Sequence, residues 1–325
     1  MSGFAGRAVL VTGGTGFIGS WLVARLLDLG TRVTLLVLDH DPASELIRTG
    51  RIRSCRVVDG RLEEFGDVER ALLASEAEFV FHLGAQALVI PALEAPLLTF
   101  EANVRGTYNL LEACRRHAKG LSAVVVASSD KAYGDAPVLP YTEEMPVAGR
   151  HPYDVSKSCA DLLARAYAHT YGLPVTVARC GNVYGGGDLA WSRIVPGTIR
   201  SVLRGERPVL RSDGRFTRDY IHVDDVVDAY LELATATGAS AKPGDVFNFA
   251  PGSPASVREI VDLLLSILGR EDLSPVVLDS ARAEIRDQAL DSGKAQRVLG
   301  WEPRTALREG LERTVAWYRA FLGAA

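Results

Sequence analysis

The chain has 325 residues, of which 47% are hydrophobic and 23% are charged, and its formal net charge is −4. This composition is that of an ordinary globular protein with enough chain for a sizeable core, and it excludes a disordered or fibrous chain. The slightly acidic balance gives no electrostatic basis for a nucleic-acid or membrane-surface partner, so we expect neither.

Cysteine usage and the N-terminal segment indicate the compartment. The four cysteines are widely spaced and form no pattern typical of a zinc site, so we expect free thiols and no metal. Glycines interrupt the N-terminal segment before any apolar run typical of a signal peptide, and no apolar run has the length to span a bilayer. We therefore expect a cytoplasmic protein.

Short apolar, β-branched runs alternate with stretches of helical period. We predict strands at Arg7–Thr12, Arg32–Leu38, Cys55–Val58, Glu78–Leu83, Ser122–Ser128 and Val175–Arg179. We predict helices at Gly16–Leu29, Asp67–Ala74, Pro96–His117 and Tyr153–Tyr171. The strands are apolar almost throughout, as expected when helices cover both faces of a parallel sheet.

This alternation predicts an α/β fold with a doubly wound parallel sheet, whose ligand crevice lies beyond the carboxyl ends of the strands. We assign residues 1–180 to this nucleotide-binding domain. Residues 181–325 have more glycine- and proline-rich loops and are predicted to form a smaller α/β substrate lobe, with some segments returning to the first domain. A capping box, Ser256 with Glu259, opens a predicted helix at Ser256–Leu268.

A glycine-rich turn predicts the cofactor. "VLVTGGTGFIG" places Gly13, Gly16 and Gly19 between the first strand and the first helix, where bare backbone lets a pyrophosphate approach the helix N-terminus. Asp39 ends the second strand, where a carboxylate can accept both ribose hydroxyls and would repel a 2′-phosphate. The pattern predicts NAD in preference to NADP. A glycine turn followed by an ordinary surface aspartate is the weaker interpretation.

A tyrosine and a lysine predict the chemistry. "YDVSK" places Tyr153 and Lys157 on one face of a helix, and Ser129 ends a strand that points into the same crevice. An ammonium near a phenol favours the phenolate, so we expect Lys157 to lower the pKa of Tyr153. Such a tyrosine can take a proton from a substrate alcohol while a hydride leaves for NAD.

Eight motifs, spread over essentially the whole chain, resemble those of the extended short-chain dehydrogenase/reductase family, the NAD-dependent sugar-nucleotide epimerases and dehydratases. They are "TGGTGFIG", "HLGAQ", "NVRGTYNLLEA", "SSDKAYG", "YDVSK", "RCGNVYGGGD", "RDYIHVDD" and "LGWEP". Within this family, "GNVYGGGDLAWSRIVP" and "AEIRDQALDSGKA" are most similar to members of the CDP-glucose 4,6-dehydratase type. The resemblance implies a Rossmann domain for NAD, a nucleotide-sugar substrate, and a homodimer through the helices at Pro96–His117 and Tyr153–Tyr171.

The resemblance also assigns individual residues. It implies a catalytic triad of Ser129, Tyr153 and Lys157, and an Asn103 that braces the catalytic loop. Implied NAD contacts are Gly13, Gly16, Phe17, Ile18, Gly19, Asp39, Leu62, Leu83, Ala85, Tyr153 and Lys157, and implied substrate contacts are Gln86, Asn182, Arg218 and Arg286. Two positions depart from the family pattern: Arg61 replaces a usual aspartate, and Gly84 replaces a usual alanine.

The pair Asp130 and Lys131 separates the activities within this family. A 4-epimerase returns the hydride to the same carbon, whereas a dehydratase also needs an acid and a base for C6 and C5. The resemblance to CDP-glucose 4,6-dehydratases implies that Asp130 protonates the departing C6 oxygen and Lys131 takes the C5 proton. We therefore expect a 4,6-dehydratase that produces a 4-keto-6-deoxy sugar, with CDP-glucose as the favoured donor.

Two alternatives stay open. In an NAD-dependent nucleotide-sugar 4-epimerase, Asp130 and Lys131 would only shape the pocket. In a non-catalytic NAD-binding regulator, the fold alone would be kept, and the intact Ser129, Tyr153 and Lys157 argue against this.

Overall fold

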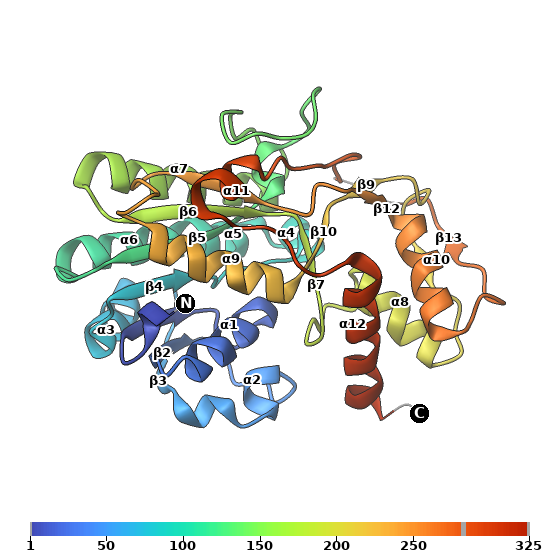
Figure 1. Cartoon of the computed structure of the whole chain (residues 1–325), viewed down its shortest axis with the longest axis horizontal. Coiled ribbons are helices and arrows are strands. Elements are labelled where there is room, and N and C mark those ends of the chain that lie inside the picture. The colour runs from blue at the N-terminus through green and yellow to red at the C-terminus, as the bar shows by residue number, and fades with distance from the viewer. Residues whose placement is uncertain (1, 281–283, 324–325) are drawn as a thin grey trace.

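Seven parallel strands form the central sheet of the computed structural model, which describes residues 2–280 and 284–323 (Figure 1). The strands are β1 (Ala8–Thr12), β2 (Arg32–Val37), β3 (Arg56–Asp59), β4 (Phe79–His82), β5 (Ala123–Ser129), β6 (Val175–Cys180) and β11 (Val246–Phe249). Their order is β11-β6-β5-β4-β1-β2-β3, so the winding reverses between β1 and β4. This confirms the predicted doubly wound sheet, to which the structure adds β11.

Two hydrophobic cores lie on the two faces of this sheet. Successive residues of β1 point to opposite faces, so Val9 and Val11 join one core while Leu10 joins the other. The first core is completed by α1 (Phe17–Asp28) and α9 (Val223–Ala236), and the second by α3 (Phe65–Ser75), α6 (Gly106–His117) and α7 (Pro152–Tyr171). Burial on both faces explains why the strands are apolar throughout.

The predicted helix at Pro96–His117 is not a uniform α-helix. It consists of α5 (Pro96–Phe100), a π-helical turn η3 (Glu101–Arg105) and α6, and it is preceded by α4 (Val89–Glu94). The π-helical turn contains the buried Asn103. Such turns occur often at functional sites because they re-aim a side chain without ending the helix.

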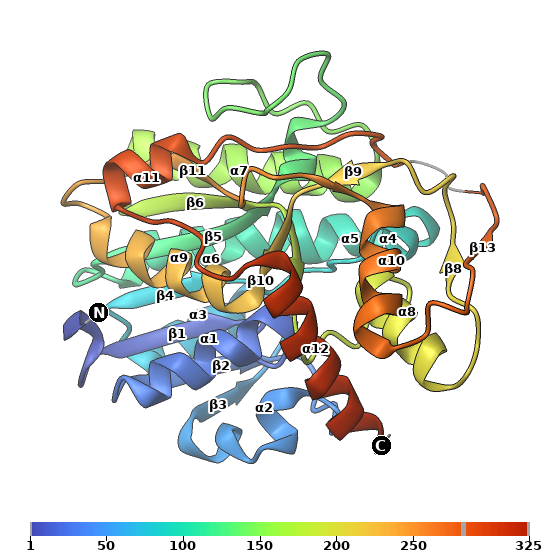
Figure 2. The same ribbon diagram turned by 45° about the vertical axis from the view of Figure 1, so that its right-hand side comes forward.

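A smaller lobe lies beyond the carboxyl ends of the sheet strands (Figure 2). Its helices α8 (Ile194–Leu203), α10 (Val257–Leu268) and α12 (Leu307–Leu322) enclose a third core. Short strands pair around them: β7 (Asn182–Tyr184) with β10 (Tyr220–His222), β9 (Thr217–Arg218) with β12 (Ala255–Ser256), and β8 (Val209–Leu210) with β13 (Val276–Val277). The predicted capping box of Ser256 and Glu259 is confirmed at the start of α10.

Segments after residue 181 also return to the larger lobe. Strand β11 extends the sheet beside β6, α9 packs on its first face, and α11 (Gly293–Leu299) contacts β11. The remaining short elements are η1 (Ser2–Phe4), α2 (Glu45–Arg48), η2 (Arg51–Ser54) and η4 (Asp130–Tyr133). The chain therefore crosses between the two lobes several times. These crossings hold in place the walls of the space between the lobes.

Within residues 2–280 and 284–323, no helix has the length and apolar character needed to cross a membrane. Over the same ranges, no group of three or more histidine, cysteine or acidic side chains is arranged to hold a metal ion. All four cysteines are free thiols.

Candidate active site

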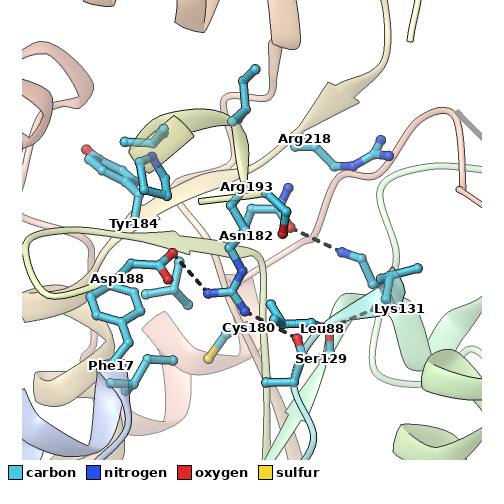
Figure 3. A pocket seen from close by; sticks show the side chains of 18 of the residues that line it. Phe17, Leu88, Ser129, Lys131, Cys180, Asn182, Tyr184, Asp188, Arg193 and Arg218 are labelled. Atoms are coloured by element: carbon cyan, nitrogen blue, oxygen red, sulfur yellow. Dashed lines mark hydrogen bonds and ion pairs between the residues drawn. The ribbon is translucent and has the colours of Figure 1, made fainter. Parts of the chain in front are cut away.

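A cleft of about 610 Å³ lies at the carboxyl ends of the sheet strands, between the two lobes. Its walls come from the glycine-rich turn and α1, from the ends of β4 and β5, from the start of α7, and from β7 to β10 of the smaller lobe (Figure 3). This is the point where the winding of the sheet reverses, the usual ligand site of a doubly wound fold.

The glycine-rich turn at one end of the cleft fits a dinucleotide pyrophosphate. Gly13 has a φ of 72°, and a Cβ there would lie 2.6 Å from the Gly84 nitrogen, while a Cβ on Gly19 would lie 2.0 Å from the Gly13 carbonyl oxygen. Helix α1 starts after Gly16 without a side-chain cap. Because Phe17, Ile18 and Gly19 of its first turn line the cleft, the helix N-terminus is available to an anion.

The other predicted NAD contacts divide into two groups. Leu83 and Ala85 line the cleft, whereas Asp39 and Leu62 do not. Asp39 is exposed beyond the end of β2. Leu62 packs closely on the backbone of Gly84. A Cβ added to Gly84 would lie 2.7 Å from Leu62 Cδ1. The departure from the usual alanine at Gly84 therefore makes room for Leu62, and the NAD contacts of Asp39 and Leu62 stay predictions.

Ser129, Tyr153 and Lys157 all line this cleft, so the structure brings the predicted triad together. Ser129 Oγ donates a hydrogen bond to Asp130 Oδ1 at 2.8 Å. Lys157 Nζ donates to the carbonyl oxygen of Ala127 at 2.9 Å. Burial lowers the pKa of Lys157 to about 8, so its ammonium form still prevails at neutral pH.

Burial opposes the expected effect of Lys157 on the pKa of Tyr153, and that effect stays a prediction. Burial raises the pKa of Tyr153 to about 12, because the phenolate would lose its hydration. The ammonium of Lys157 is directed to the Ala127 carbonyl, and Arg193 is the main nearby charge that favours the phenolate. Arg193 is thus an electrostatic neighbour of the tyrosine that sequence reasoning missed.

Asp130 and Lys131 begin η4 directly after Ser129. Lys131 lines the cleft, whereas Asp130 is 1% exposed and lies outside the lining. Lys131 Nζ donates to Asn182 Oδ1 at 3.1 Å (Figure 3). It also lies 3.5 Å from Asp130 Oδ1. The acid, the amine and the predicted substrate contact Asn182 therefore form one connected group.

A buried network holds η4 in place. The hydroxyl of Tyr133 donates to Asn248 Oδ1 at 2.7 Å, and its ring stacks on Tyr141 at a centroid distance of 4.7 Å. The guanidinium of Arg179 lies 4.5 Å from the same ring and pairs with Asp161 at 2.7 and 2.9 Å. Because Arg179 and Asp161 are fully buried, this pair fixes β6, α7 and η4 relative to one another.

Asn103 braces the loop after β4. Its Oδ1 accepts from the Gln86 backbone N–H at 2.7 Å, and its Nδ2 donates to the Gln86 carbonyl at 3.0 Å and to Ser156 Oγ at 2.9 Å. The amide of Gln86 bonds to the backbone of Leu88 at 2.5 and 3.1 Å, and Gln86 is not among the residues lining the cleft. Its predicted substrate contact stays a prediction.

Arginines gather in the half of the cleft formed by the smaller lobe. The predicted Arg218 lines it, with its guanidinium donating to the carbonyls of residues 217, 285 and 286. Arg286 is exposed, pairs with Asp287 at 3.8 Å and does not line the cleft. Three further arginines line it instead, namely Arg193, Arg200 and Arg211. The sequence signal for these three arginines was that they precede Arg218 in the same part of the chain. This signal does not separate them from exposed arginines, which occur in the same region.

Comparison with known proteins agrees with this geometry. The sequence pattern of the NAD dependent epimerase/dehydratase family matches residues 9–250. The chain is 33% identical to a CDP-glucose 4,6-dehydratase of Salmonella typhimurium, over 98% of this chain and 92% of that protein. It is similar to the solved UDP-glucose 4-epimerase of Thermotoga maritima, with a TM-score of 0.87 and 33% identity over 97% and 99% of the two chains. It is also similar to an NAD-bound dTDP-glucose 4,6-dehydratase of Streptomyces venezuelae, with a TM-score of 0.86 and 31% identity over 97% and 98%. The chain belongs to the NAD-dependent epimerase/dehydratase family.

Proposed function

We propose that this protein is a nucleotide-sugar 4,6-dehydratase, which converts a nucleoside diphosphate glucose into its 4-keto-6-deoxy form. The observation that carries the proposal is the Asp130–Lys131 pair, because Lys131 lines the same cleft as Ser129, Tyr153 and Lys157. Removal of water across C5 and C6 needs an acid and a base beyond the tyrosine, and this pair supplies both.

The first step is oxidation at C4. Tyr153 takes the proton of the C4 hydroxyl. NAD held at Gly13, Gly16 and Gly19 would supply the acceptor for the C4 hydride and the donor of that hydride to C6 after elimination, and the Lys131 ammonium then returns a proton to C5. Ser129 Oγ donates its own proton to Asp130, so its lone pairs can accept a hydrogen bond from the sugar. Lys157 holds a positive charge in the same wall because its pKa of about 8 leaves the ammonium protonated at neutral pH.

The second step is elimination. Oxidation at C4 acidifies the C5 proton, which neutral Lys131 takes, while protonated Asp130 gives a proton to the departing C6 oxygen. The 3.5 Å between Lys131 Nζ and Asp130 Oδ1 lets one proton pass from ammonium to carboxylate, which produces both reactive forms at once. A bound sugar that excludes water favours this neutral pair, because two buried charges cost more solvation than two neutral groups. Since Asp130 lies outside the cleft lining, its carboxyl group must turn toward the sugar in this step.

The substrate half of the cleft supports a diphosphate. Arg193, Arg200, Arg211 and Arg218 line it, and guanidinium groups bind phosphate oxygens through paired hydrogen bonds.

We favour CDP-glucose as the donor because the Salmonella CDP-glucose 4,6-dehydratase matches 98% of this chain. We also favour NAD over NADP, because a carboxylate just after β2, which Asp39 supplies, would repel a 2′-phosphate.

A nucleotide-sugar 4-epimerase is the second candidate. It is favoured by the burial of Asp130 outside the cleft lining and by the similarity to the Thermotoga UDP-glucose 4-epimerase. In that case Asp130 would only hold Ser129 and Lys131. Incubation of the purified protein and NAD with CDP-, dTDP-, UDP- and GDP-glucose separates the two. Loss of one water from one donor supports the dehydratase, whereas interconversion of glucose and galactose forms supports the epimerase.

We also propose a homodimer through the helices α5, α6 and α7. Leu97 and Leu98 of α5 are 69% and 64% exposed, and Leu162 of α7 is 52% exposed, although α5 and α7 pack together in the chain. A second copy that covers these apolar side chains would form a four-helix interface. Light scattering during size-exclusion chromatography should give twice the chain mass, and Leu98→Glu should give the single-chain mass.

A cytoplasmic location is part of the same proposal. Cys114 and Cys180 are buried free thiols, and burial raises their pKa to about 12, which keeps them as unreactive thiols. Unpaired cysteines are typical of a reducing compartment. Fractionation of cells that express the tagged protein should place it in the cytosolic fraction.

A further inference from the structure

Arg193 is held on the wall of the cleft by two contacts. Its Nη1 pairs with Asp188 Oδ2 at 3.0 Å, and its Nη2 donates to the carbonyl oxygen of Ala87 at 3.2 Å. Asp188 is buried, and its other carboxylate oxygen accepts from the Ala190 backbone N–H at 3.1 Å. Figure 3 shows the pair of Asp188 and Arg193. The direction of this guanidinium therefore depends on where the backbone holds Asp188.

The chain reaches that aspartate through three glycines, which pack against two tryptophans. Trp21 of α1 donates from its indole Nε1 to the carbonyl oxygen of Gly186 at 2.7 Å. A Cβ on Gly186 would overlap the indole ring of Trp317 of α12. Gly187 has a φ of 89°, and a Cβ there would lie 3.6 Å from Trp21 Nε1. Residues 185–188 are therefore a segment of bare backbone held between a helix of the larger lobe and a helix of the smaller lobe.

The 185–188 segment also contacts the start of the helix at the cofactor end of the cleft. Trp21 lies one helical turn after Phe17, which lines the cleft, and a Cβ on Gly185 would lie 3.4 Å from Phe17 Cζ. Two residues of chain span at most about 7 Å, so a shift at the carbonyl bonded to Trp21 reaches Asp188 with little slack. The carbonyl of Asp188 accepts from the hydroxyl of Tyr318, which holds the far end of the segment.

We propose that Trp21 is a positioning residue for the substrate: through Gly186 and Asp188 it fixes Arg193 where the diphosphate of a nucleotide sugar binds. This inference rests on the proposed function, because it takes Arg193 as a contact of the diphosphate. A guanidinium that is already held in place loses less side-chain freedom when a phosphate binds, so more of its interaction energy appears as affinity. Loss of the indole N–H should therefore weaken nucleotide binding more than it slows the chemical steps.

The test measures the affinity of the NAD-loaded protein for CDP, and in parallel for UDP, dTDP and GDP, by isothermal titration calorimetry. Trp21→Phe keeps an aromatic ring but has no N–H to donate to the Gly186 carbonyl. It should weaken binding of the nucleotide about fivefold, which corresponds to one ordinary hydrogen bond. With the nucleotide sugar, KM should rise by a similar factor while kcat stays close to the wild-type value.

A double-variant cycle shows whether Trp21 acts through Arg193. Arg193→Met removes the guanidinium and should itself weaken nucleotide binding. If Trp21 acts by holding this guanidinium, Trp21→Phe should cause little further loss of affinity in the Arg193→Met background. Additive losses in the double variant would mean that the indole does not act through Arg193, and would overturn the inference.

Trp301→Phe is the matched control. The Trp301 indole also donates to a backbone carbonyl, that of Asp225, at 3.1 Å, but Trp301 does not line the cleft. Its replacement should lower the free energy of unfolding and leave the affinity for CDP unchanged. An equal loss of affinity in Trp21→Phe and Trp301→Phe would show a general effect of destabilisation and would contradict the specific role of Trp21.

Hydrogen exchange followed by mass spectrometry tests the same link without a nucleotide. In NAD-loaded Trp21→Phe, peptides that cover residues 185–193 should exchange faster, because the amide of Ala190 depends on the position of Asp188. Trp301→Phe should leave these peptides unchanged. Unchanged exchange in Trp21→Phe contradicts the inference even if the protein binds no nucleoside diphosphate. Faster exchange without binding of any of the four nucleotides contradicts only the proposed function.

Discussion

The Nζ of Lys131 lies 3.5 Å from Oδ1 of Asp130, yet only the lysine lines the cleft. The carboxylate stays behind it, bonded to Ser129 Oγ. In the proposed dehydratase, this relationship supplies an amine at the cleft surface and an acid close enough to exchange a proton with it. It distinguishes this chain from a family member whose only acid-base group is the tyrosine.

Lys131→Ala should abolish dehydration while C4 oxidation survives. The tyrosine and NAD still perform the first step, but no base remains for the C5 proton, and loss of a positioned base costs about 100- to 10,000-fold in rate. NADH should therefore accumulate after mixing with substrate, where the wild-type protein shows only a transient. Lys119→Ala, at an exposed position just after α6, should behave like the wild type. A variant Lys131→Ala that still releases water at the normal rate would contradict the assignment.

His82 should make the fold sensitive to acid. Its Nδ1 contacts Thr12 Oγ1 at 2.8 Å and its Nε2 contacts Thr107 Oγ1 at 3.1 Å, while burial lowers its pKa to about 3. The unfolded chain binds this proton below about pH 6.5 and the folded chain does not, so stability is lost as pH falls from 6.5 toward 3. The contribution is about 1.4 kcal/mol per pH unit in that window.

The free energy of unfolding, measured in urea at several pH values, tests this role of His82. His82→Gln should reduce the slope of unfolding free energy against pH by about one proton. His169→Gln replaces an exposed histidine and should leave the slope unchanged. Equal slopes for the wild type and His82→Gln would show that His82 is not held neutral by burial.

The buried pair of Arg179 and Asp161 should support both stability and catalysis. Arg179→Met leaves the Asp161 carboxylate buried without its partner, which costs about 3 to 5 kcal/mol of unfolding free energy. It also removes the cation above the Tyr133 ring, so η4 loosens and turnover falls. Arg258→Met breaks the exposed pair with Asp262 and should cost less than about 1 kcal/mol. Urea denaturation measures the free energy of unfolding of both variants. Similar losses in Arg179→Met and Arg258→Met would contradict the claim that burial makes the Arg179–Asp161 pair important for stability.

Gly84 and Leu62 should be coupled. A Cβ at Gly84 would lie 2.7 Å from Leu62 Cδ1, so Gly84→Ala should cost about 1 to 3 kcal/mol. Leu62→Ala removes the clashing atom and leaves space that the new methyl group partly fills. The double variant should therefore be more stable than the sum of the two single losses by about 1 kcal/mol. Additive losses would mean that the two side chains do not share this space.

Local patterns in the sequence determine much of this fold. The buried runs of β1 and β6 and the glycines before α1 are recognisable because their burial and backbone conformation demand those residue types. Strand β11 escaped prediction because four residues in a loop-rich region carry too little periodicity. The π-helical turn at Asn103 has no pattern of its own within a helical sequence.

Residues that line the cleft could be predicted where a motif places them together, as for Ser129 and Lys131 and for Tyr153 and Lys157. Arg193 was missed because its place in the cleft depends on how the smaller lobe folds back over the sheet. The same folding leaves Arg286 exposed and places Arg200 and Arg211 in the cleft. The effect of burial on Tyr153 could not be read from the spacing of Tyr153 and Lys157, because it depends on every element packed around the phenol.

The most direct measurement follows a label through one reaction. The NAD-loaded protein is incubated with CDP-glucose that carries deuterium at C4, and the product is examined by mass spectrometry and NMR. A 4,6-dehydratase should release one water and place the deuterium in the C6 methyl group, since the hydride taken from C4 is returned to C6. A product that has lost no water and keeps the deuterium at C4 would contradict the dehydratase and identify an epimerase.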